Sequence, residues 1–177
     1  FPQISTPGGQ RAPDVNKAIN NRIDKGCLIV NYTGHGGEVG WGHERFLENS
    51  DINSWTNYDH MPIFITATCE FSRYDDPDRV SAGEYAYLNP QGGAIAMFTT
   101  ARATFGGSNF NLNTALFDIM FEKNGDGYYC FGDLIRIAKN QGGVVDNDKK
   151  FILLGDPALH LAYPQHEVVT TRINGED

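Results

Sequence analysis

The sequence predicts an α/β fold in which a mainly parallel sheet is flanked by helices. Three short apolar runs, at residues 27–32, 61–68 and 93–100, have the composition of strands that are buried on both faces. Segments with helical periodicity alternate with these runs. Such alternation is typical of βαβ units, whose strands are parallel.

The first helix is expected at residues 13–25, where apolar side chains recur at helical spacing. Pro13 stands in its first turn and Gly26 follows its end, as is common for helices. Three later segments have helical character: residues 80–88, 111–122 and 133–140. A short last strand is expected near residues 158–162, after a turn made by residues 155–157.

Composition limits the function. The chain has 177 residues, of which 14 are basic and 22 acidic, and its formal net charge is −8. A chain of this length buries roughly 70% of the surface that it exposes when unfolded, which is enough for one sizeable core. The basic residues are scattered rather than clustered as nucleic-acid binding requires. The apolar runs are far below the ~20 residues of a membrane-spanning helix. We therefore expect one acidic globular domain that binds no nucleic acid and spans no membrane.

The ends of the chain predict a piece of a longer protein. The sequence begins at Phe1 rather than at Met and shows no signal-peptide pattern. After Leu161 its character changes, and residues 168–173 alternate apolar and polar side chains. We expect residues 1–163 to form the domain and residues 164–177 to form a linker or the first strand of a following domain.

A candidate active site lies where two predicted strands end. The run at 27–32 leads into His35, which has glycine on both sides, and the run at 61–68 leads into Cys69. The carboxyl ends of parallel strands meet at one edge of a sheet, so His35 and Cys69 reach the same edge if their strands are close. An imidazole beside a thiol removes its proton or stabilises the thiolate, which otherwise forms only near pH 8.5. The pair predicts an activated nucleophile.

The glycines that follow His35 are expected to contribute backbone N–H groups to the same site. The backbone N–H of Gly36 or Gly37, together with that of Cys69, is expected to form an oxyanion hole, in which one donor contributes about 3 kcal/mol to transition-state stabilisation.

A structural interpretation of the same residues stays open at this point. A cysteine at the end of a strand is usually a small buried hydrophobe, and Gly-His-Gly is also a tight turn. The placement of both motifs after consecutive strands favours catalysis. Cys27 and Cys130 lack that placement and are expected in the core. The odd number and the spacing of the cysteines argue against a disulfide scaffold and a thiolate zinc site.

Three motifs, at residues 30–36, 66–70 and 154–159, resemble the gingipain-type cysteine peptidases. Their sequences are Val-Asn-Tyr-Thr-Gly-His-Gly, Thr-Ala-Thr-Cys-Glu and Leu-Gly-Asp-Pro-Ala-Leu. The resemblance implies a caspase-like three-layer domain, here truncated. It implies a cysteine endopeptidase that acts on proteins or peptides without a cofactor, with Cys69 as nucleophile and His35 as general acid/base.

The run at residues 69–77, followed by residues 81–84, is most similar to the type IX secretion sortases of this family. That resemblance implies a bacterial enzyme that is secreted or held at the outer-membrane surface. Such an enzyme removes C-terminal sorting domains from exported cargo through an acyl-enzyme and passes the acyl group to a lipopolysaccharide amine. Its partners would include those sorting domains, the lipopolysaccharide acceptor and other secretion-system surface proteins. The alternative is a non-catalytic caspase-like scaffold within a secretion complex.

Two expectations concern parts that the family has and this chain lacks. The family orients its histidine with an acidic residue far upstream, whereas only 34 residues precede His35 here. Either Glu38, Glu44 or Asp51 substitutes, or the orienting group lies in a missing half. Missing strands would also leave a sheet edge uncovered, and uncovered edges pair with other chains. We therefore expect homo-association of the chain.

The resemblance places a pocket wall after the third strand, formed by Thr99, Thr100, Ala101 and Arg102. Arg102 either contacts a substrate carboxylate or is a solvated surface side chain.

The acidic turn of Asp75, Asp76 and Asp78 has the closely spaced carboxylates that bind calcium, and a solvated turn before the helix at residue 80 explains it as well. The spacing of His35, Glu38 and His43 differs from that of a helical zinc motif, so no metal ligands are assigned.

Overall fold

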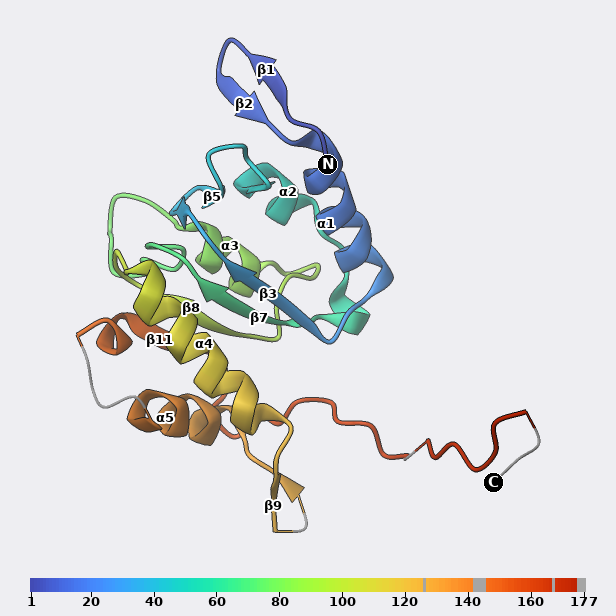
Figure 1. Cartoon of the computed structure of the whole chain (residues 1–177). Coiled ribbons are helices and arrows are strands. Elements are labelled where there is room, and N and C mark those ends of the chain that lie inside the picture. The colour runs from blue at the N-terminus through green and yellow to red at the C-terminus, as the bar shows by residue number, and fades with distance from the viewer. Residues whose placement is uncertain (126, 142–145, 167, 175–177) are drawn as a thin grey trace.

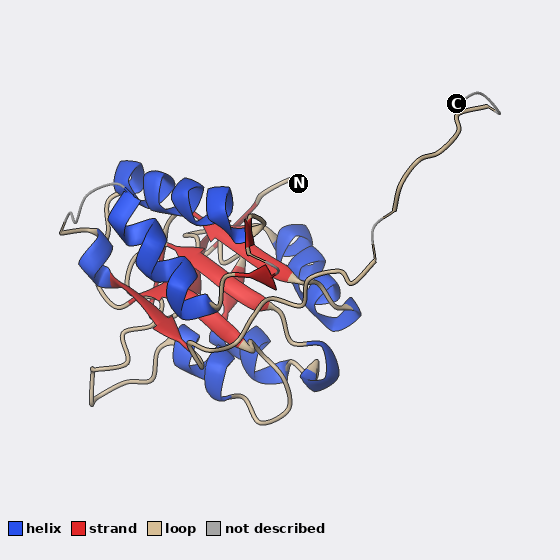
Figure 2. Ribbon diagram, turned by 90° about the horizontal axis from the view of Figure 1, so that it is seen from below, coloured by secondary structure: helices blue, strands red, loops and turns tan. Residues whose placement is uncertain are grey.

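The computed structural model describes residues 1–125, 127–141, 146–166 and 168–174. Within these residues a four-stranded sheet has helices on both of its faces, which gives three layers (Figure 1, Figure 2). The strand order is β11-β8-β7-β3. The strands are β3 (Ile29–Thr33), β7 (Ile63–Ala67), β8 (Ala96–Thr100) and β11 (Phe151–Leu154). The first three are parallel and β11 is antiparallel to β8, so the predicted α/β class with a mainly parallel sheet is confirmed.

Burial along β7 explains the two layers of helices. Ile63, Ile65 and Ala67 belong to the apolar core that includes residues of α4 (Gly106–Met120) and α5 (Phe131–Gln141). Phe64 belongs to the core on the other face. The helices that contribute to that second core are α1 (Pro13–Lys25), α2 (Asn49–Ser54) and α3 (Ala82–Leu88). Because side chains alternate between the faces of a strand, β7 is buried on both, as its apolar sequence predicts.

The predicted helices appear in the structure. The helix α1 has the expected bounds, with Pro13 in its first turn, and it ends where Gly26 adopts a φ of 87° that favours glycine. The segments predicted at 80–88, 111–122 and 133–140 correspond to α3, α4 and α5, and α4 begins five residues earlier than expected, at Gly106.

Several short elements escape the sequence patterns because each has only two to six residues. They are the hairpin of β1 (Ile4–Thr6) and β2 (Gly9–Arg11), the helix α2, the small sheet of β4 (Gly36–Gly37), β5 (Gly40–Trp41) and β6 (Leu47–Glu48), the hairpin of β9 (Lys123–Asn124) and β10 (Gly127–Tyr128), and the 3₁₀ turns at Tyr58–His60 and Asp148–Lys150. The small sheet shapes the loop that carries His35.

The fourth strand lies elsewhere than predicted. It is β11, and residues 158–162 form no strand, so the turn at residues 155–157 follows the last strand instead of leading into it. Hydrogen bonds explain the error. The carbonyls of Pro157 and Leu159 accept from the backbone N–H groups of Gly132 and Phe131, at 2.9 and 2.8 Å. The segment therefore packs against the start of α5 and does not join the sheet.

Two of the cysteines also differ from expectation, whereas the assignment of residues 164–177 to a linker or to the first strand of a following domain stays a prediction. Cys27 and Cys130 are half-buried rather than in the core, and all three cysteines are free thiols. Burial raises the pKa of Cys27. Tyr163 still packs against the core, with its hydroxyl donating to the Met120 carbonyl at 2.5 Å. Residues 164–166 and 168–174 then extend away from the sheet (Figure 1, Figure 2), and residues 168–172 form no strand. None of the helices in the described ranges combines the length and the apolar character that a membrane span requires.

Candidate active site

The two candidate catalytic residues follow neighbouring parallel strands. β3 pairs with β7 up to Thr33 and Ala67, and His35 and Cys69 each lie two residues beyond that last pair. The Gly34 amide donates to the Ala67 carbonyl at 3.3 Å, which extends the contact past the ladder. The structure therefore brings His35 and Cys69 to one edge of the sheet, as the strand pattern predicts.

The thiol of Cys69 is held by Thr104. The Thr104 backbone N–H donates to Cys69 Sγ at 3.4 Å, and the thiol lies 3.7 Å from the Thr104 carbonyl, to which it can donate. Among the described residues, the hydrogen-bond partner of this half-buried thiol is Thr104 and not His35. Catalytic hydrogen bonds are often incomplete without substrate, so the two side chains remain candidates for one site.

A buried polar network supports the loop that contains Thr104. Asn109 donates from Nδ2 to Thr104 Oγ1 at 2.9 Å and to the Ala67 carbonyl at 3.3 Å. Its Oδ1 accepts from Asn147 Nδ2 at 3.1 Å, and Asn147 Oδ1 accepts from the Phe105 amide at 2.9 Å. Both amide side chains are 4% exposed. The sequence patterns missed both residues, because Asn109 lies before the helix predicted at residues 111–122 and Asn147 lies outside every predicted element.

The loop after Cys69 has an unusual backbone. Glu70, the next residue, has a φ of 48°, a left-handed conformation that is uncommon outside glycine. Its amide donates to the Arg102 carbonyl at 3.3 Å, and the Ser72 amide donates to the Thr100 carbonyl at 2.9 Å. The end of β8 therefore holds the loop after Cys69 in this turn. Strained backbone of this kind is concentrated at functional sites.

The position of His35 is fixed through its backbone, and its side chain is exposed. The His35 carbonyl accepts from the Tyr32 hydroxyl at 2.7 Å and from the Gly42 amide at 2.8 Å. Burial, with a smaller effect from Glu44, raises the pKa of Tyr32 to about 12, so this hydroxyl keeps its proton at neutral pH. The rings of His35 and His43 lie 5.4 Å apart, tilted by 39°.

The three acids considered as partners of His35 are engaged elsewhere. Glu38 accepts from Arg73 at 2.9 Å and from Arg79 at 3.3 Å. Glu44 accepts from Gln3 at 3.3 Å. Asp51 caps the start of α2 and accepts from Asn16 at 2.7 Å. The expectation that one of them orients His35 has no support in a hydrogen bond of the described residues.

The glycine after His35 packs against the residue before Cys69. A Cβ at Gly36 would lie 2.5 Å from Thr68 Oγ1 and 2.9 Å from the Gly40 carbonyl, whereas a Cβ at Gly37 would meet nothing within 4 Å. The two loops therefore touch at Gly36, and glycine is required there. That the amides of Gly36 and Cys69 form an oxyanion hole stays a prediction.

A surface pocket of about 560 Å³ opens beside His35. The small sheet of β4, β5 and β6 forms it together with His43 and Arg45, and Cys69 is not among its lining residues.

The predicted pocket wall is mostly internal. Thr99 and Thr100 are 0% exposed, and their hydroxyls bond to Thr66 and to the Thr68 carbonyl. Ala101 is 8% exposed. Of the four residues, only Arg102 is exposed. That these residues line a substrate pocket stays a prediction.

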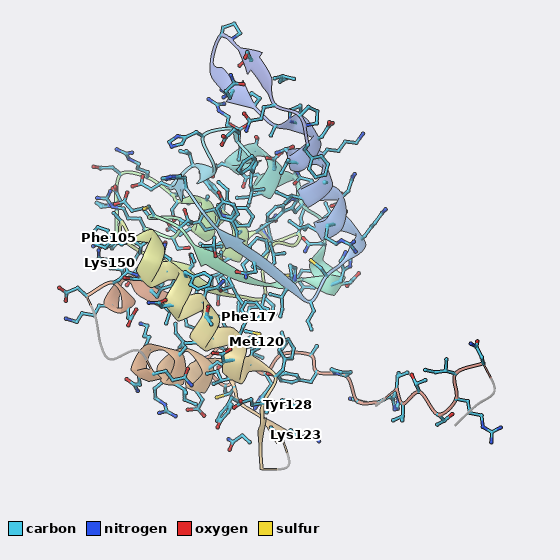
Figure 3. All side chains as sticks on the ribbon, in the orientation of Figure 1. Phe105, Phe117, Met120, Lys123, Tyr128 and Lys150 are labelled. Carbon is cyan, nitrogen blue, oxygen red and sulfur yellow. The ribbon has the colours of Figure 1, made fainter. Side chains whose placement is uncertain are left out.

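Arg102 binds an acid of this chain. Its guanidinium forms a bidentate ion pair with Asp75, which lowers the pKa of that carboxyl. A separate cation–π contact lies at the start of α4, where Lys150 Nζ is 4.7 Å from the centre of the Phe105 ring (Figure 3).

Two of the three acids in the acidic turn, Asp75 and Asp76, likewise form ion pairs with arginines. Asp75 binds Arg102, and Asp76 lies 3.8 and 4.0 Å from Arg73 and Arg79. Within the described ranges, no group of three or more His, Cys, Asp or Glu side chains is placed to hold a metal ion. Calcium binding at this turn therefore stays a prediction without geometric support.

Comparisons with known proteins found one matching family and several similar solved structures. The model of peptidase family C25 matches residues 1–162. The crystal structure of the Arg-specific cysteine proteinase gingipain R is similar, with a TM-score of 0.70, 19% identity, and coverage of 82% of this chain and 36% of that one. A complex of the pro- and mature domains of RgpB from Porphyromonas gingivalis gives a TM-score of 0.69, 20% identity, and coverage of 82% and 37%.

These likenesses confirm the predicted gingipain-like fold, and at such identities they concern the fold alone. The chain spans little more than a third of the length of those structures. Curated proteins gave no match.

Proposed function

The chain belongs to peptidase family C25, the gingipain family, and from that premise we propose that it is a cysteine peptidase with Cys69 as nucleophile and His35 as general acid/base. One observation carries the proposal. Neighbouring parallel strands deliver an exposed imidazole and a half-buried thiol to the same sheet edge, where active sites of parallel α/β folds lie.

The proposed reaction has two steps. His35 takes the thiol proton, Sγ of Cys69 bonds to the carbonyl carbon of the peptide, and a tetrahedral oxyanion forms. As the C–N bond breaks, His35 returns the proton to the leaving amine, and an acyl-enzyme remains on Cys69. A water molecule or an amine then attacks the thioester, gives its proton to His35 and releases the thiol. The Thr104 amide, which donates to the sulfur at 3.4 Å, would hold Sγ in place for the first step.

Within the family we further propose the sortase role of type IX secretion, as in PorU, with transfer to an amine such as that of lipopolysaccharide. The support is the motif at residues 69–77 with residues 81–84. C-terminal sorting domains would then be the substrates and the bacterial cell surface the location. Incubation with cargo that carries a sorting domain, plus triglycine as amine acceptor, tests this finer proposal. A cargo product extended by triglycine supports transfer, and a product with a free carboxylate alone contradicts it.

A non-catalytic scaffold is the second candidate. Two observations favour it: the thiol bonds to Thr104 rather than to His35, and the three candidate acids bond to other residues.

One experiment decides between the candidates. The chain and its Cys69→Ala and His35→Ala variants are incubated with a tryptic digest of bacterial protein, and new peptide ends are identified by mass spectrometry. The peptidase proposal predicts new ends with the wild type that disappear in both variants, while their melting temperatures stay within about 2 °C, since neither side chain is part of the core. Equal cleavage by all three proteins, or none by any, favours the scaffold.

A further inference from the structure

The sheet does not by itself fix how close His35 comes to Cys69. Its ladder between β3 and β7 ends at Thr33 and Ala67, and the two side chains are carried by loops beyond that point. The loop of His35 continues into β4, and the loop of Cys69 continues toward α3. Contacts between the loops must therefore set the separation of imidazole and thiol.

An ion pair provides such a contact. Glu38 lies three residues after His35 and Arg73 lies four residues after Cys69. Arg73 Nη1 donates to Glu38 Oε1 at 2.9 Å. Among the described residues, this is the one hydrogen bond that joins residues 34–38 to residues 69–73. The Glu38 side chain is only 12% exposed and that of Arg73 is 38% exposed. Losing the arginine would therefore leave a largely buried carboxylate short of a partner.

The pair belongs to a wider cluster of charges. Arg73 lies 3.8 Å from both Glu70 and Asp76. Arg79 lies 3.3 Å from Glu38 and 4.0 Å from Asp76. Isolated surface ion pairs contribute little to stability, but a partly buried network with shared partners holds its members in one geometry.

The Glu38 backbone is anchored as well. Its carbonyl accepts from the amide of Ala82, the first residue of α3, at 2.7 Å. The side-chain carboxylate and the backbone carbonyl of Glu38 are thus both bonded to the segment that follows Cys69. The carboxylate is occupied by two guanidinium groups, so its contribution to His35 is made through the loop and not by direct contact.

We propose that Glu38 and Arg73 are positioning residues whose ion pair fastens the His35 loop to the Cys69 loop and sets the approach of the imidazole to the thiol. This inference rests on the proposed Cys69–His35 function. A misplacement of about 1 Å between catalytic groups lowers the rate of the catalysed reaction by up to roughly 100-fold, so a contact that fixes their separation matters for catalysis.

The test measures reactivity of Cys69 rather than peptide cleavage. Iodoacetamide alkylation is followed at pH 6 and pH 9, and mass spectrometry of the peptide containing Cys69 separates it from Cys27 and Cys130. The variants are Glu38→Gln, Arg73→Gln, their combination and Arg73→Lys. Arg136→Gln, in an exposed ion pair on α5, is the matched control, and His35→Ala is the reference for a thiol without its imidazole.

The expected result is that the ratio of the pH 6 rate to the pH 9 rate falls by about tenfold or more in Glu38→Gln and Arg73→Gln, approaching His35→Ala. The double variant should lose no more than either single one, because both remove the same contact. Arg73→Lys should retain part of the ratio, since it keeps the charge, and Arg136→Gln all of it. If Glu38→Gln lowers the melting temperature strongly, the ratio of rates in Arg73→Lys decides the test. A partly lowered ratio then supports the positioning role, and a wild-type ratio refutes it.

Two different results would overturn the inference. A wild-type ratio in the Glu38 and Arg73 variants, with a low ratio in His35→Ala, refutes the positioning role and leaves the dyad intact. An unchanged ratio in His35→Ala refutes the dyad itself, and the ion pair then has nothing to position.

Discussion

Replacing Asn109 with Ala tests the buried network beneath Cys69. Asn109 is 4% exposed and makes three hydrogen bonds, to the Ala67 carbonyl, to Thr104 Oγ1 and from Asn147 Nδ2. Each such bond contributes about 1 kcal/mol net, so the loss sums to about 3 kcal/mol. The buried Asn147 amide would also lose an acceptor, which makes this a lower bound.

The assay is thermal and urea denaturation followed by circular dichroism. For a chain of this size, 3 kcal/mol corresponds to a fall in melting temperature of about 6–12 °C. The matched control is Asn111→Ala on the exposed side of the same helix, which should stay within about 0.5 kcal/mol of the wild type. A loss below about 1 kcal/mol for Asn109→Ala would refute the network, since one ordinary hydrogen bond is worth that much.

Two further predictions concern the loop of His35. Gly36→Ala should lower the melting temperature and Gly37→Ala should leave it nearly unchanged, because a Cβ at Gly36 meets Thr68 Oγ1 at 2.5 Å and one at Gly37 meets nothing within 4 Å; equal effects would contradict this. The raised pKa of Tyr32, about 12 against 10 for the free side chain, means that the folded chain keeps a proton that the unfolded chain loses. Its contribution to the unfolding free energy is complete below pH 10 and is lost as pH rises through about 12. Tyr32→Phe should therefore flatten the fall in stability between about pH 10 and 12 in urea titrations, and an unchanged slope would count against it.

Local patterns predicted the parts of the fold that depend on local signals. The helix at Pro13–Lys25 has a proline start, a glycine end and regular apolar spacing, and all three are visible in sequence. The parallel strands were recognisable because strands buried on both faces are apolar throughout. The fourth strand was misplaced because residues 151–154 and 158–162 both carry apolar side chains, and only tertiary hydrogen bonds to α5 separate their structures.

Of the candidate site, the positions of Cys69 and His35 could be predicted from the sequence, and the residues that hold them could not. Cys69 and His35 follow strands that could be recognised, and parallel pairing places them together. The groups that hold them come from far along the chain: Asn109 and Asn147 are 38 residues apart, and Glu38 and Arg73 are 35 apart. Contacts at such separations leave no periodic signal in one sequence. The pocket-wall residues Thr99 and Thr100 are a related case, because their burial depends on how the Cys69 loop crosses the end of β8.

In the proposed reaction, Cys69 forms a covalent acyl-enzyme with the help of His35. The most direct measurement is the mass of the peptide containing Cys69 after the chain has been mixed with a peptide digest and quenched in acid within seconds. Thioester adducts are expected on Cys69 in the wild type and not in His35→Ala, and no adduct is expected on Cys27 or Cys130. Cleavage of the digest that proceeds equally in Cys69→Ala, or adducts that form on another cysteine, would contradict the proposed reaction.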